Sequence, residues 1–210
     1  MNVKKLLIGT VFAVGVIFAP AQFALAEGET LKSAEQAFQQ QIQNSMDQLK
    51  MAIEVRDRAI QVMADETKGA KEAPQQIKAM IESLKGLNSG FDEGSQFRTT
   101  LEAVGAFLDQ QIADLLADPD QTVREAAESM KVRREQVAEL QKQTFELVER
   151  GKTLIRKLED RRRVMEKLIA VEKMDTVISV AREALDQYKN ALTAFESVAE
   201  RSNSYVVPGS

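Results

Sequence analysis

Apolar residues recur at steps of three and four through most of the chain, which is the spacing of one face of an α-helix. The first such stripe predicts a helix over residues 30–68, with Thr30 at its N-terminal cap. Gly69 predicts the end of this helix, and Pro74 predicts the start of a second helix over residues 74–87. No stretch alternates with the period of two that predicts a strand.

Residues 86–95 hold three glycines among polar residues, so they predict a loop. Phe91 is an apolar residue of this segment, and we expect it to pack into one end of a bundle. Beyond the loop, apolar side chains at helical spacing predict a third helix over residues 95–117. Asp118 followed by Pro119 is typical of a helix start, with the acid as the cap and the proline in the first turn.

The fourth predicted helix, over residues 119–173, is the longest. Its apolar positions alternate steps of three and four in a sustained heptad pattern. A helix of this length would extend about 80 Å, whereas a compact globule of this size is only about 30–40 Å across. The alternative is a break at Gly151, because an interior glycine costs about 1 kcal/mol. A change of register then predicts either a fifth helix that begins at Asp175 or a kinked continuation.

These elements predict an all-α fold, an elongated antiparallel helical bundle or coiled coil of four to five helices. We expect the long first and fourth helices to lie antiparallel, with the shorter helices packed along them. Residues 27–201 are predicted to form this single domain, and residues 202–210 are predicted to be a C-terminal tail.

Residues 1–26 have the three-part pattern of a secretory signal peptide. Lys4 and Lys5 precede an apolar run over residues 6–18, and small residues stand before a predicted cleavage site after Ala26. The run is shorter than the roughly 20 residues that cross a membrane as a helix. The pattern predicts export to the bacterial periplasm, or out of the cell; an uncleaved N-terminal anchor is the alternative.

Composition excludes several classes of function. The chain has no His and no Cys, which removes disulfides, the common zinc, haem and iron–sulfur sites, and triads with a His base. Loss of Lys4 and Lys5 would leave 26 basic against 32 acidic residues, a net charge of −6. That balance argues against nucleic-acid binding. The acidic residues are better explained as helix caps than as catalytic pairs, so we predict no enzymatic activity, no cofactor and no metal site.

A basic run within the fourth predicted helix is the main candidate for a binding surface. Its members are Arg150, Lys152, Arg156, Lys157, Arg161, Arg162 and Arg163. Only Glu159 and Asp160 oppose them, so the local charge is +5. Such a run is suited to anionic headgroups, envelope polysaccharide or an acidic partner. The alternative is a solvated helix face, since Glu146, Glu159 and Glu166 stand at pairing distance from Arg150, Arg163 and Arg162.

Two arginines occupy positions of the heptad seam where a dimeric coiled coil favours apolar residues. Arg133 and Arg161 either meet acids on a partner helix or lie at a bundle edge, with their stems on apolar neighbours and their charged ends in water. The second interpretation is preferred. The methionines are spread over the stripes, which predicts that they fill the core rather than bind a soft metal.

The sequence thus predicts a non-enzymatic exported protein that acts as a scaffold, adaptor or chaperone. Its long helices would bind a protein partner or a second copy of the chain. The alternative function is peripheral binding to a membrane or to the cell envelope through the basic run.

Overall fold

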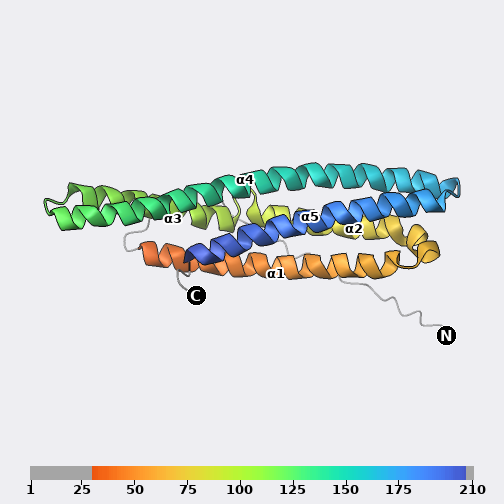
Figure 1. Cartoon of the computed structure of the whole chain (residues 1–210), viewed down its shortest axis with the longest axis horizontal. Helices are drawn as coiled ribbons and strands as arrows, with labels where there is room; N and C mark the ends of the chain where they lie inside the picture. Colours follow the sequence, from red (N-terminus) through yellow and green to blue (C-terminus); the bar gives the residue numbers. More distant parts are fainter. Residues whose placement is uncertain (1–29, 207–210) are drawn as a thin grey trace, which may run out of the picture.

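The computed structural model describes residues 30–206, and almost all of them are helical. Its helices are α1 (Leu31–Met63), α2 (Glu66–Phe91), α3 (Gln96–Ala117), α4 (Gln121–Ala170) and α5 (Met174–Val206). The prediction of an elongated all-α bundle is confirmed (Figure 1). The predicted signal peptide, residues 1–26, and the end of the predicted tail, residues 207–210, lie outside the described part.

Four legs make the bundle, and α2 and α3 together form the second of them (Figure 1). The chain runs out along α1, back along α2 and α3, out along α4 and back along α5. The prediction that the first and fourth helices are antiparallel was therefore wrong. They run parallel on one diagonal, and each packs against α2, α3 and α5. The cause is the short segment between α2 and α3, which breaks a leg without reversing it.

The outer parts of α3 and α4 form a two-helix arm that projects past the other helices (Figure 1). The start of α1 and the end of α5 both meet α4 at Arg133, which contacts Glu35 and the ring of Tyr205. From there to its tip the arm contains roughly twelve residues of α4, or about 18 Å of helix. Four helices thus share the body of the rod, and two make the arm.

The first helix ends earlier than predicted. Thr30 caps α1 as expected, but α1 stops at Met63, and Asp65 caps α2 by accepting a hydrogen bond from the Lys68 amide at 2.9 Å. Gly69 does not end a helix; it lies inside α2. A Cβ at residue 69 would come within 2.9 Å of the Val62 carbonyl, so glycine allows the start of α2 to pack against the end of α1.

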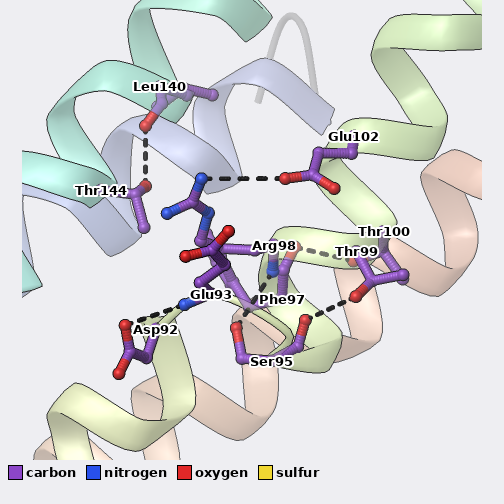
Figure 2. A network of polar contacts seen from close by, with 10 residues as sticks. All are labelled: Asp92, Glu93, Ser95, Phe97, Arg98, Thr99, Thr100, Glu102, Leu140 and Thr144. Atoms are coloured by element: carbon purple, nitrogen blue, oxygen red, sulfur yellow. Dashed lines mark hydrogen bonds and ion pairs between the residues drawn. The ribbon is translucent and has the colours of Figure 1, made fainter. Parts of the chain in front are cut away.

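The predicted loop over residues 86–95 is mostly helix. Helix α2 continues to Phe91, and only residues 92–95 are non-helical. Gly94 has a φ of 80°, a conformation that favours glycine, and Ser95 caps α3 through the Arg98 amide at 3.2 Å (Figure 2). Phe91 is buried at this joint rather than at the end of the bundle.

Helix α4 is continuous through Gly151, which confirms the first of the two interpretations of this segment. Its cap is Asp120 rather than Asp118, because the Thr122 amide donates to Asp120 at 2.8 Å. At the other end the chain forms a separate fifth helix. Helix α5 runs on to Val206, so the first five residues of the predicted tail are helical, and Ser202 and Tyr205 are buried.

Helix α4 ends, at the corner with α5, in a left-handed residue that is not glycine. Glu172 has a φ of 56°, the Lys173 amide donates to the Leu168 carbonyl at 3.0 Å, and the Glu172 amide donates to the Ile169 carbonyl at 3.0 Å. This is the Schellman pattern, in which glycine is the preferred residue at the left-handed position. Glu172→Gly should raise the free energy of unfolding by about 0.5–1 kcal/mol, as measured by urea unfolding. An unchanged or lowered stability would contradict this corner geometry.

Tyr188 ties α5 to two other helices. Its buried hydroxyl donates to the Ala52 carbonyl of α1 at 3.0 Å and lies 2.9 Å from the Ser83 hydroxyl of α2. Burial raises the pKa of Tyr188 to about 12, although the Ser83 contact opposes it. Burial also raises the pKa of Tyr205 to about 12, against the opposing charge of Arg133.

These two raised pKa values predict a loss of stability at high pH. Folding favours the neutral phenol, so its contribution is complete below the ordinary pKa of 10.0 and is lost as the pH rises through about 12. The chain has only these two tyrosines and no tryptophan, so tyrosinate absorbance reports them directly. The native protein should show little ionisation near pH 10, whereas the urea-unfolded chain is half ionised there. Equal titration curves would refute the prediction.

Candidate functional site

The basic run lies on the half of α4 that packs against α2 and α5, and intrahelical ion pairs neutralise part of it. Arg150 pairs with Glu146 at 3.3 Å, and Arg162 pairs with Glu166 at 3.3 Å, both at the predicted spacing. The third predicted pair does not form, because Arg163 meets Asp160 at 3.6 Å. These contacts favour the solvated-face interpretation for this part of the run.

Other members of the run hold neighbouring elements. Lys152 lies 3.2 Å from Asp92, at the end of α2, and 3.1 Å from Glu149. The hydrogen bonds to Glu149 and to Asp92 raise the pKa of Lys152. Burial acts to raise the pKa of Asp92, but the hydrogen bonds from Glu93 and Lys152 outweigh it and hold the pKa below its usual range. Lys152 therefore anchors the joint between α2 and α3.

The two seam arginines meet acids on other helices and also lie at the bundle edge, so each of the two interpretations from the sequence holds in part. Arg133 pairs with Glu35 of α1, and Arg161 pairs with Glu183 of α5. Both guanidinium groups lie at the bundle edge, with side chains that are 29% and 21% exposed. The acids that meet them belong to the same chain, while the buried Nη1 of Arg161 has no hydrogen-bond partner among the described residues.

Arg156 and Lys157 are the members of the run that are exposed and form no ion pair with any residue in the described part. A groove of about 290 Å³ lies nearby between α2 and α4. Lys78 and Lys85 of α2 face Arg162 and Arg163 across it, with Glu82 and Glu159 beside them. Lys85 pairs with both acids, at 3.2 and 3.5 Å.

The extension of the basic surface onto α2 was not predicted from the sequence. Lys78 and Lys85 stand seven residues apart, which places them on one face of a helix. That spacing was visible in the sequence. What the spacing does not show is that this face lies next to α4, because a pattern within one helix carries no information on its neighbours.

The arm presents a second exposed surface. Leu116 is 47% exposed and Val132 is 56% exposed, while Ile112 and Leu115 are half-buried in the contact between the two helices. Exposed large apolar side chains also lie on the four-helix body, where Met51 is 60% exposed and Phe145 is 56% exposed. The arm differs in that each of its helices has one helix neighbour instead of two.

Nowhere in residues 30–206 do three acidic side chains gather as they would around a metal ion. In the same range, no helix is both long enough and apolar enough to cross a membrane.

Comparisons with protein-family models, with curated proteins and with solved structures find no match to this chain.

Proposed function

We propose that this is a non-enzymatic exported protein that acts as a scaffold, adaptor or chaperone through contacts between helices in the bacterial periplasm. The observation that supports it most is the two-helix arm (Figure 1). Its α4 part runs from Gln121 to Arg133, or about 18 Å of helix beyond the four-helix body. The arm exposes Leu116 near its tip and Val132 at its base, so it offers a partner apolar side chains along its length.

The test places a photo-crosslinking amino acid at Leu116 or Val132 in the full-length protein inside cells. A matched control carries it at Gln75, an exposed residue on the body of α2. We expect crosslinks from the arm and few from Gln75. One dominant protein in fixed ratio identifies an adaptor, and many unrelated exported proteins identify a chaperone.

Equal crosslinking from the arm and from Gln75 would contradict a role for the arm. A cleaved, exported form is a second requirement, tested by the N-terminal sequence of the protein recovered from the periplasm. Recovery only from the cytoplasm would contradict the exported location, and retention of residues 1–26 would contradict cleavage.

A second function, binding to an anionic membrane or envelope surface, has one specific observation in its favour. Lys78 and Lys85 of α2 widen the basic surface of α4 beyond Arg162 and Arg163. Each basic residue near an anionic bilayer contributes about 1 kcal/mol. The surface runs along the side of the rod, so it would lie flat against such a layer.

The vesicle test replaces basic residues of α4 that form no ion pair with another helix of the described part. Replacing Arg156, Lys157 and Arg163 by Glu should abolish binding to anionic vesicles at low salt. The matched control replaces Lys32, Arg58 and Lys142 by Glu, which changes the net charge equally on other surfaces. Equal binding by both triple variants would remove the basic surface from consideration.

A further inference from the structure

A polar hollow of about 580 Å³ lies where the second leg breaks between α2 and α3. One wall is α1, and the other is the end of α2, the joint at residues 92–95 and the start of α3. Figure 2 shows the joint side of this region, where Asp92 accepts a hydrogen bond from the Glu93 amide and Ser95 caps α3. An unbroken second leg would place a regular helix surface here, so the hollow is a product of the break.

Side-chain amides dominate the α1 wall. Gln41, Asn44 and Gln48 stand at steps of three and four, so they share one face of the helix. Asn44 donates to the Gln41 side-chain oxygen at 3.3 Å, which orients both groups. An amide both donates and accepts hydrogen bonds, and the Gln41 nitrogen has no partner within residues 30–206. The Gln41 nitrogen is therefore an unused donor on this face, while the side-chain oxygens of Gln41 and Asn44 each accept one hydrogen bond, from Asn44 and Gln40.

The side-chain oxygen of Gln48 is a hydrogen-bond acceptor without a donor in the described part of the folded chain. This oxygen, Oε1, is buried. Gly90 lies against it, and a Cβ at residue 90 would come within 2.7 Å of this oxygen. Glycine at that position leaves the amide in the wall of the hollow. Because Oε1 is enclosed, a ligand hydroxyl meets it only when the amide turns toward the hollow, and the new hydrogen bond would then satisfy a group whose burial is costly.

The charged residues that line the hollow indicate which class of ligand it can bind. Asp92 and Glu93 line the hollow, and no lysine or arginine does, so an anion is disfavoured. The one aromatic residue in the lining, Phe97, is 2% exposed and offers little apolar surface to a side chain of a peptide. Amides together with carboxylates fit a neutral ligand that carries many hydroxyl groups.

We propose that this hollow binds a neutral saccharide, with Gln41, Asn44 and Gln48 on one side and Asp92 and Glu93 on the other. The site is separate from the arm, and it meets the basic run at Asp92, which pairs with Lys152 at 3.2 Å. It stands or falls independently of the scaffold function proposed above.

The test uses the mature protein with two neutral disaccharides, chitobiose and maltose, and with triglycine as a peptide probe. Saturation-transfer NMR detects contact, and titration gives the dissociation constant, which we expect near 1 mM or below for at least one disaccharide. Gln41→Ala combined with Asn44→Ala should weaken that binding at least about tenfold. The control pair, Gln39→Ala with Gln43→Ala, removes two exposed amides of the same helix and should leave the constant within about twofold.

A second variant tests the Gln48 wall without removing an amide. Gly90→Val should displace the Gln48 side chain into the hollow and weaken saccharide binding while circular dichroism shows an unchanged helix content. Three results would overturn the proposal: no saturation transfer to either disaccharide at about 10 mM, equal weakening by the control pair, or binding of triglycine alone.

Discussion

Replacing Phe91 by alanine is expected to lower the free energy of unfolding by about 3–5 kcal/mol. The ring is 1% exposed and lies 4.6 Å from the ring of Phe97 and 5.6 Å from that of Phe195, between centroids. Phe97 in turn contacts Phe38 at 5.1 Å. This aromatic cluster joins α1, α2, α3 and α5 at the break in the second leg. Its loss leaves a cavity that four helices cannot all move to fill.

The matched control is Phe145→Ala. Phe145 is 56% exposed on α4, so its removal should change the free energy of unfolding by no more than about 0.5 kcal/mol. Urea unfolding followed by circular dichroism measures both variants. Similar losses for the two would mean that the cluster does not hold the joint as described.

Gly151→Ala is expected to destabilise the protein by about 1–3 kcal/mol, although alanine is the better helix former. Gly151 is buried where α4 crosses α2, and a Cβ there would lie 2.1 Å from the Asn88 side-chain oxygen. Asn88 is only 5% exposed, and its amide nitrogen donates to the Val148 carbonyl at 3.4 Å. The amide therefore has no free space into which it can move.

Two further variants separate this contact from a general effect of glycine. Gly86→Ala should stabilise the protein by about 0.5–1 kcal/mol, because residue 86 is helical and exposed, and a Cβ there meets no other atom within 4 Å. Asn88→Ala combined with Gly151→Ala should recover most of the loss, since the smaller side chain leaves room for the new methyl group. A loss in the double variant as large as in Gly151→Ala would refute the proposed clash.

The helices and their buried faces could be predicted from the sequence, because the apolar positions at helical spacing indicate which face of a helix is buried. The long seam of α4, including Gly151, was correctly predicted as one helix. The methionines followed the same rule in large part: Met63, Met80 and Met165 are buried in the core, while Met51 is 60% exposed.

Helix direction and the ends of α2 could not be read in this way. A stripe gives no information on which helix it meets, and residues 92–95 contain the same glycine and polar signals as a reversing turn. Gly69, Gly86 and Gly90 were interpreted as helix breakers. Two of them are instead places where another segment approaches closely: Gly69 meets the end of α1, and Gly90 meets Gln48. Only the packed structure distinguishes a glycine that ends a helix from one that makes room.

The candidate binding surface was predictable only within one helix. The pairs Arg150–Glu146 and Arg162–Glu166 followed from spacing along α4. The pairs of Arg133, Lys152 and Arg161 with acids of α1, the α2 end and α5 depend on helix neighbours, which spacing does not supply. The polar hollow was missed for the same reason, because its two walls are about fifty residues apart in the chain.

The contact of Tyr205 with Glu35, at 3.4 Å, places the start of α1 beside the end of α5 at the base of the arm. A short flexible linker between residues 30 and 206 would therefore close the described chain into a ring with little rearrangement. New ends opened at the corner formed by residues 171–173 would leave every leg and the arm intact. Circular permutation is thus compatible with this architecture, and it would give a version of the protein whose ends lie at the extremity farthest from the arm.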